Sequence, residues 1–115
     1  MNKFSNQIEF IKCEKKIQPS WFGLPILINK KFSRKKFKYL EYLNTKGIET
    51  RPIISGNFIN QPAIKLYKLD KINKKKFNNA QKVEDLGFFI GLHTKKLTNR
   101  ICKYIAFHLL KIDEI

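Results

Sequence analysis

The residues best suited to chemistry in this 115-residue chain lie in one stretch, GIETRPIISGNFINQP, at residues 47–62. Arg51 precedes a proline, which favours an extended backbone at the arginine and so directs its guanidinium group. A guanidinium held in this way is suited to binding phosphate or carboxylate. Gly56-Asn57 is typical of a turn with positive φ and an exposed side-chain amide. The stretch predicts an anion-binding loop, although a solvated arginine and an ordinary turn explain the same residues.

Two histidines are the other candidates. His93 follows the expected strand end at Gly91, in a turn that can present polar groups to a ligand, and an ordinary loop histidine is an equal alternative. His108 follows Tyr104 by four residues in the terminal segment and is interpreted as a packed helix histidine. The sequence has no GxSxG, no glycine-rich phosphate loop and no paired histidines or carboxylates at metal-binding spacing. We therefore predict no catalytic residue and no metal site within the chain.

The formal net charge of +15 is the strongest bias in composition. Clustered basic residues attract nucleic acids, but only three of the 24 basic residues are arginines, and the lysines are scattered over several segments. No predicted element carries a platform of arginines and aromatic residues. We expect nucleic-acid binding to be weak and independent of base sequence, and a basic nucleic-acid-binding module is kept as an alternative function.

Cysteine content and hydropathy indicate a cytoplasmic chain with no membrane partner. Cys13 and Cys102 are isolated in the sequence, which argues against both a disulfide framework and a zinc site. Residues 1–16 alternate polar and apolar residues and have no continuous apolar core of a signal peptide. The longest apolar run, Trp21 to Ile28, is far shorter than the roughly 20 residues that cross a bilayer.

The first half of the chain predicts two strands around a helix. Residues 21–28, WFGLPILI, have the apolar and β-branched composition of a buried strand, with Pro25 indicating a sheet edge or a bulge. A helix is predicted over 34–46, with Ser33 as its N-cap, Gly47 as its end and an apolar face formed by Phe37, Leu40 and Leu43. Residues 48–54 return to a strand pattern.

The second half predicts a loop, two helices and one strand. Residues 65–77 are interpreted as a lysine-rich loop with at most a short helical turn, and 79–86 as a short helix. GFFIG, residues 87–91, predicts a buried strand, and a last helix begins after Thr98 with an apolar stripe of Ile101, Ile105, Leu109 and Ile112. The expected fold is a single α+β domain over 1–115, with a small antiparallel or mixed sheet and helices packed on one face.

Three ordered motifs resemble one enzyme family. SWFGLPILI (20–28), GIETRPIISGNFINQP (47–62) and GFFIGLH (87–93) are similar to the small C-terminal domain of the DegT/DnrJ/EryC1/StrS sugar aminotransferase family. The similarity is greatest to the branch of nucleotide-linked 4-keto-6-deoxyhexose 3-dehydratases and extends from about Ile8 onward. The family consists of dimeric fold-type I enzymes that use pyridoxal or pyridoxamine phosphate, with a large cofactor-binding domain that this chain does not resemble.

Departures from the family pattern favour the dehydratases over the aminotransferases. The aminotransferases commonly carry histidine where this chain has Phe22 and Ile53, and the GN-x-x-x-QP pattern that ends at Gln61-Pro62 also fits the dehydratases. Leu92 is the opposite departure, because the dehydratases carry asparagine there. The small domain of a sugar aminotransferase therefore stays an alternative function.

The resemblance implies which residues face the active-site cleft. The candidates for contact with substrate or cofactor are Phe22, Arg51, Asn57, Gln61 and His93. We expect Phe22, Arg51, Asn57 and His93 to lie toward one side of the fold, with plain core as the alternative role for Phe22.

The resemblance also implies what the chain cannot do by itself. The cofactor's phosphate cradle, the aspartate for its ring nitrogen and the residue at its reactive carbon belong to the large domain, so enzyme status is left open. The expected function is that of a C-terminal fragment of a deoxysugar 3-dehydratase for lipopolysaccharide O-antigen, inactive alone. Its expected partners are a large-domain polypeptide or a homodimer mate and a nucleotide-linked deoxysugar. A truncation, one half of a split gene and a remnant are equally compatible with the sequence.

Overall fold

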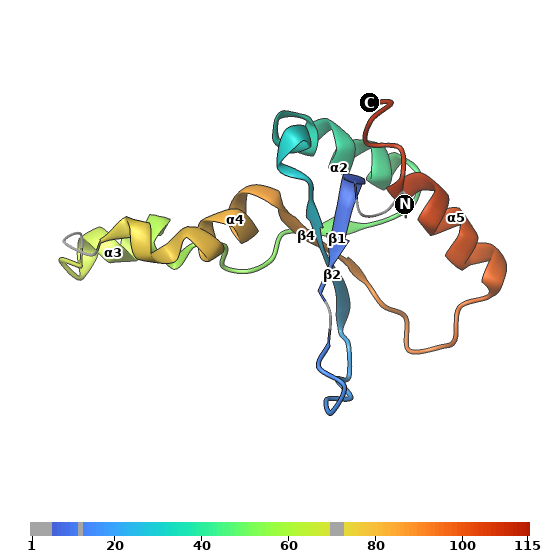
Figure 1. Cartoon of the computed structure of the whole chain (residues 1–115), viewed down its shortest axis with the longest axis horizontal. Helices are drawn as coiled ribbons and strands as arrows, with labels where there is room; N and C mark the ends of the chain where they lie inside the picture. Colours follow the sequence, from blue (N-terminus) through green and yellow to red (C-terminus); the bar gives the residue numbers. More distant parts are fainter. Residues whose placement is uncertain (1–5, 12, 70–72) are drawn as a thin grey trace.

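Four short strands form one antiparallel sheet in the computed structural model of the chain, which describes residues 6–11, 13–69 and 73–115 (Figure 1). The strands are arranged in the order β1-β2-β4-β3. Their bounds are β1 Ile8–Phe10, β2 Gly23–Ile28, β3 Thr50–Arg51 and β4 Gly87–Gly91. The α+β class with a small antiparallel sheet is confirmed, and β1 is an additional strand that the sequence pattern did not predict.

Strand β2 lies inside the sheet, so the edge position predicted from Pro25 is wrong for the strand as a whole. The pairing with β1 ends at Phe10 and Ile26, whereas the pairing with β4 continues through Pro25 opposite Phe89. Pro25 therefore has a strand neighbour on one side only. Proline has no backbone N–H to donate. It is tolerated at this position because no strand of the described chain pairs with Pro25 on its other side.

The first helical segment begins earlier than predicted. A 3₁₀ helix, η1 (Lys30–Lys35), leads into α2 (Lys36–Thr45), and the side chain of Asn29 caps η1 by accepting from the Lys31 N–H. The predicted cap at Ser33 is wrong because that residue lies within η1. The predicted end at Gly47 is confirmed, since this glycine follows the helix with a φ of +74°.

The predicted apolar face of this helix is wrong in one position. Phe37 is 80% exposed, while Tyr39 and Leu43 are completely buried. The spacing of four residues between Tyr39 and Leu43 places both on the face that meets the sheet. Tyrosine was overlooked as a core residue because it carries a polar hydroxyl, which here has a buried partner.

Strand β3 covers only two residues of the predicted 48–54 strand. Three short helical segments follow it in the described part of the chain, and the last of them is the helical turn that the loop predicted over 65–77 allowed. These segments are η2 (Phe58–Asn60), α3 (Pro62–Leu66) and η3 (Lys74–Phe77). Residues 70–72 of the predicted loop lie outside the described residues.

The remaining predicted elements are confirmed. Helix α4 covers Asn78–Leu86 and leads directly into β4. Helix α5 covers Asn99–Leu109, and the side chain of Thr98 caps it by accepting from the Ile101 N–H. The predicted stripe on this helix is buried only toward its end, because Ile101 is exposed and Ile112 follows the helix.

The core lies between one face of the sheet and helices α2 and α5. Alternating residues of the paired strands point to this face, as in the opposed pair Ile26 and Phe88. The buried core residues of the sheet, of α2 and of the C-terminal segment are Ile8, Ile26, Ile28, Phe88, Ile90, Tyr39, Leu43, Leu109 and Ile112. The opposite face carries partly exposed residues that include Pro25, Leu27 and Phe89.

Tyr39 connects three elements. Its ring meets Phe88 of β4 edge-on at a centroid separation of 5.9 Å, and its hydroxyl donates to the Leu109 carbonyl at the end of α5. Burial raises the pKa of the Tyr39 hydroxyl, so this group stays protonated and remains a hydrogen-bond donor at ordinary pH.

The chain is extended for its size because η2, α3, η3 and α4 form an arm that projects away from the sheet and from α5 (Figure 1). The radius of gyration is 16.2 Å, whereas a compact domain of this length has about 13 Å. The accessible surface is 9481 Å², whereas a monomer of this mass exposes about 6,600 Å². The molecule thus exposes about 2,900 Å² more surface than its mass predicts.

None of the helices in the described part of the chain has the length and apolarity needed to span a membrane.

We predict that Tyr39→Phe destabilises the fold by about 1–3 kcal/mol, because the buried Leu109 carbonyl then lacks its donor. The free energy of unfolding in urea measures the effect. Tyr67→Phe is the matched control, since Tyr67 is exposed. Equal stability of Tyr39→Phe and the parent chain would contradict the role given to the hydroxyl.

Stability should also fall at acid pH through His108. Burial lowers the pKa of this buried ring, and the charges of Lys46 and Lys111 lower it further. The folded state therefore favours the neutral form of His108. The stabilisation that the neutral ring gives to the fold is complete above about pH 6.5 and is lost as the pH falls through the lower folded-state pKa. Between pH 7.5 and pH 5, the melting temperature of His108→Gln should fall less than the melting temperature of the parent. His93→Gln, at an exposed position, should retain the parent's slope.

Candidate functional site

A hollow of about 560 Å³ opens where β3 and the end of β4 meet helix α5. Its mouth carries Phe22 and Arg51, two of the residues predicted to face a ligand. Its walls are mainly apolar and come from both strands and from the first half of α5. The residues that form these walls include Ile48, Phe89, Ile90, Ile101, Tyr104 and Ile105.

Arg51 is held in place by its neighbour Glu49. The guanidinium Nη2 lies 2.7 Å from Glu49 Oε1, and the arginine Nε donates to the same oxygen at 2.9 Å. Both side chains are mostly exposed, so the pair contributes little to stability. Among the described residues the remaining N–H groups of the guanidinium have no hydrogen-bond partner, so they can bind an anion beside the hollow.

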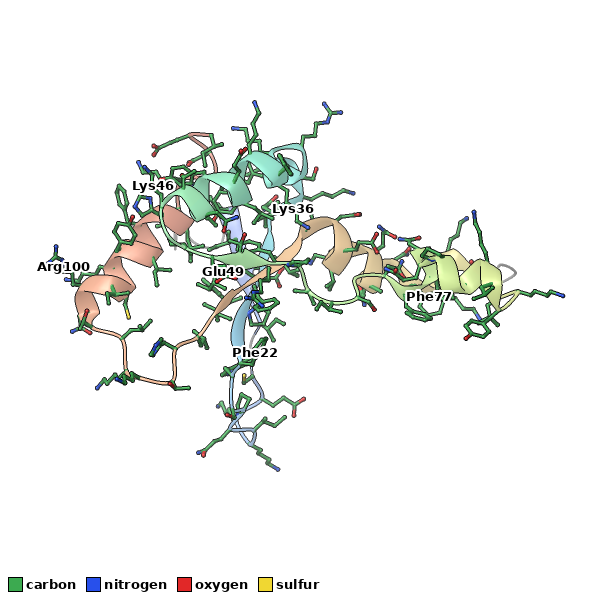
Figure 2. The ribbon with its side chains drawn as sticks, turned by 180° about the vertical axis from the view of Figure 1, so that it is seen from behind. Phe22, Lys36, Lys46, Glu49, Phe77 and Arg100 are labelled. Carbon is green, nitrogen blue, oxygen red and sulfur yellow. The ribbon has the colours of Figure 1, made fainter. Side chains whose placement is uncertain are left out.

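Phe22 is exposed, which argues against the alternative that it belongs to the core. Its ring meets the ring of Phe89 at 5.5 Å, and Phe89 is the register partner of Arg51. The backbone carbonyl of Phe22 accepts from the Leu92 N–H, so the start of β2 and the end of β4 are tied together. Figure 2 shows Phe22 where β2 begins, below Glu49 in this view.

His93 follows Leu92 directly and is exposed. Its Nδ1 accepts from the Lys95 N–H at 3.0 Å, which leaves the other ring nitrogen available to a ligand. Phe22, Arg51 and His93 therefore come from neighbouring strands at one end of the sheet, and of these Phe22 and Arg51 line the hollow.

Asn57 has a different environment from the one expected of it. It is 2% exposed, so its amide is buried rather than presented at the tip of a turn. Its backbone N–H donates to Glu84 Oε2 at 2.6 Å, and its side-chain Nδ2 donates to Gln81 Oε1 at 3.0 Å. Its side-chain oxygen accepts from the Ile59 N–H and caps η2. All polar groups on this side chain are engaged within the protein.

The predicted positive φ at Gly56 is confirmed, with a value of +64°. A Cβ added at this glycine would lie 3.1 Å from the side chain of Glu84. Both the backbone conformation and the close contact therefore require glycine.

Glu84 and Gln81 of α4 are anchors that the sequence analysis missed. The Glu84 carboxylate accepts from the Asn57 backbone and from the Asn60 amide, and Gln81 Oε1 accepts from both asparagine amides. Their signal in the sequence was the polar face of the helix predicted over 79–86. Gln81 and Glu84 are three residues apart and therefore lie on the same side of that helix. Gln61 closes the same loop by donating to the Ser55 carbonyl. Asn57 and Gln61 thus fix the loop against α4 and do not line the hollow.

A wider hollow of about 1320 Å³ lies between β1, the start of η1 and α4. Its floor is formed by buried Ile8, Ile28 and Leu86, and its rim is formed by exposed polar residues such as Arg34 and Lys82. Lys82 is already close to Glu9, at 3.4 Å. None of the predicted site residues lines this hollow, so the smaller one is the better candidate for a functional site.

Binding of a pyridoxal-type cofactor to this chain would need a reactive lysine beside the hollow. A lysine that binds such an aldehyde needs a lowered pKa. Lys36 is a described lysine with a lowered pKa. Burial lowers the pKa of its amine, and the charges of Asp85 and Glu84 oppose this effect. However, Lys36 Nζ donates to the Glu84 carbonyl, beside α4 and away from the hollow. The described His, Cys, Asp and Glu side chains also form no group that could hold a metal ion.

No family model matches the chain. Curated proteins do match it, and the chain spans only about a fifth of their length. GDP-4-keto-6-deoxy-D-mannose 3-dehydratase of Escherichia coli O55:H7 is 33% identical over 84 residues, which are 73% of this chain and 21% of that protein. The same-named protein of Yersinia pseudotuberculosis is 28% identical over 82% of this chain and 23% of its own length. Lipopolysaccharide biosynthesis protein RfbH of Salmonella typhimurium is 26% identical over 82% of this chain.

Solved structures of the same enzymes share the fold. E. coli GDP-4-keto-6-deoxy-D-mannose-3-dehydratase with bound hydrated PLP superimposes with a TM-score of 0.68 at 30% identity, over 96% of this chain and 28% of that one. A structure of the dehydratase with a trapped PLP-glutamate geminal diamine gives a TM-score of 0.67 over the same shares. By sequence and by fold, the chain is therefore homologous to one segment of the PLP-dependent GDP-4-keto-6-deoxymannose 3-dehydratases, as its three motifs predict.

Proposed function

We propose that residues 1–115 form the small C-terminal domain of a nucleotide-linked 4-keto-6-deoxyhexose 3-dehydratase. The observation that carries this proposal is the joint match of sequence and fold to enzymes of that activity. Its place would be in the synthesis of deoxysugars for lipopolysaccharide, the process named for the Salmonella relative. The exposed free cysteines Cys13 and Cys102 are compatible with the reducing cytoplasm, where we place the protein.

The surface of the chain supports a role as part of a larger enzyme. About 2,900 Å² of surface beyond the expectation for a monomer is exposed, and a stable interface covers roughly 800 Å² on each partner. A large-domain polypeptide, within the same chain or separate, would account for this exposure. Without that domain the chain is expected to be inactive, because its lysines do not provide the cofactor site.

The hollow of about 560 Å³ between β3, β4 and α5 is called the edge hollow. We assign it to the substrate side of the cleft. Arg51 offers free N–H groups suited to the diphosphate of a nucleotide sugar, and Glu49 orients them. Phe22 supplies an exposed ring for an apolar contact, and His93 offers a free ring nitrogen at the same edge. Asn57 and Gln61 contribute indirectly, because they hold the 55–61 loop in one conformation.

In the complete enzyme, the cofactor would activate the sugar at its C4 ketone so that the C3 hydroxyl is lost. The part of this chain is limited to binding: Arg51 would hold the anionic end of the substrate, and the apolar wall would restrict access of water. We assign no proton transfer to any residue of this chain.

Exchange of a segment tests the proposal. This chain would replace the matched segment of the E. coli O55:H7 dehydratase, and the chimera would be assayed with GDP-4-keto-6-deoxy-D-mannose and the cofactor. We expect formation of the 3-deoxy product, with no turnover by the isolated chain. Borohydride reduction of the isolated chain with pyridoxal phosphate should give scattered lysine adducts. Formation of a 4-amino sugar would favour the aminotransferase alternative, and a folded but inactive chimera would contradict the proposal.

Arg51→Ala in the chimera should raise KM for the nucleotide sugar about tenfold or more, because one charge-assisted interaction is lost. Arg34→Ala is the matched control, since Arg34 is an exposed arginine outside the edge hollow. An unchanged KM in Arg51→Ala would remove Arg51 from the substrate side.

A further inference from the structure

The arm, residues 55–86 with η2, α3, η3 and α4, exposes several large apolar side chains. Leu66 and Tyr67 at the end of α3 are 77% and 72% exposed. The exposed set on the arm comprises Phe58, Leu66, Tyr67, Leu69 and Phe77. Figures 1 and 2 show α3 and Phe77 on the outer part of the arm, away from the sheet and from α5. A patch of this kind on a soluble protein marks an interaction surface.

The charge along the arm is mainly positive. From Ser55 to Leu86 the sequence contains seven lysines, no arginine and three acidic residues. Lys65, Lys68, Lys75 and Lys76 are exposed, and none of these described lysines has an ion-pair partner in the described part of the chain. Exposed apolar residues interspersed with lysines along one segment have the composition of an interface with an apolar core and a polar rim. The rim requires a partner surface with acidic groups.

Two further observations identify the partner. A second copy of the chain is disfavoured because each copy carries a net charge of +15 and the same lysine rim. The related structures contain this fold within chains of which it makes up 28%, so most of each related protein lies outside the match. A domain of that size can cover the arm as well as the edge hollow.

We propose that the arm docks onto the catalytic large domain, at a surface with an apolar centre and acidic side chains around it. This inference rests on the proposed function. The anchoring of the arm is consistent with such a role. The carboxylate of Glu84 in α4 holds the loop at the start of η2, and Lys36 Nζ ties the end of α4 to α2. The arm is thus fixed at its base, so it presents its apolar residues in a defined position.

Substitutions on the arm test this docking in the chimera described above. Leu66→Ser combined with Tyr67→Ser should lower the melting temperature of the chimera by about 2–6 °C and leave that of the isolated chain nearly unchanged. Phe37→Ser is the matched control, because Phe37 is 80% exposed on α2, outside the arm. It should change neither protein.

Charge reversal tests the acidic rim of the partner. Lys75→Glu combined with Lys76→Glu should also destabilise the chimera, and 0.5 M salt should reduce the difference from the parent. Lys38→Glu on α2 is the control, at another exposed lysine.

Equal melting temperatures of the arm variants and the parent chimera would overturn the docking, and so would failure of the parent chimera to fold. A folded chimera that lacks dehydratase activity but is destabilised by the arm substitutions would support the docking and refute the proposed function. The two ideas can therefore fail separately.

Discussion

The contact of Tyr39 with Phe88 and Leu109 is the constraint on which the rest of the fold depends. Phe88 lies in β4, which pairs on both sides, and Leu109 ends α5, so one side chain of α2 ties together the sheet and both helices of the core. The buried hydroxyl has a partner, which removes the cost of placing a polar group in the core. This junction fixes the start of β4 at Phe88. The next residue, Phe89, pairs with Arg51 and contacts the ring of Phe22.

The core formed in this way uses only part of the chain. The sheet, α2 and α5 bury a continuous apolar cluster, whereas the arm and the edge hollow leave large apolar side chains in contact with water. Exposed apolar area of this extent is costly unless another surface covers it. The homology to a segment of a larger enzyme and the excess surface are two independent observations with one explanation. The core holds the sheet and the two helices together, and we propose that a larger protein completes the exposed surfaces.

Sequence patterns predicted the elements whose signals are local. The stripe before Leu86, the GFFIG strand and the Thr98 cap each depend on residues close in sequence, and these elements were found at nearly their predicted bounds. Strand β1 was missed because three residues are too few for a periodic pattern, and its position depends on pairing with β2. Phe37 was assigned to the core because its spacing fits, but the sheet meets the face of Tyr39 instead. At the site, Phe22 and Arg51 line the same hollow, whereas the role of Asn57 depends on Glu84, 27 residues away. Such a partner cannot be read from local spacing.

We infer that a catalytic domain covers both the arm and the edge hollow. Hydrogen–deuterium exchange of peptides from residues 58–69 and 87–93 tests it most directly, compared between the isolated chain and the chimera. We predict slower exchange of both segments in the chimera, with peptides from α2 as an unchanged reference. Equal exchange of these segments in the two proteins would contradict the claim.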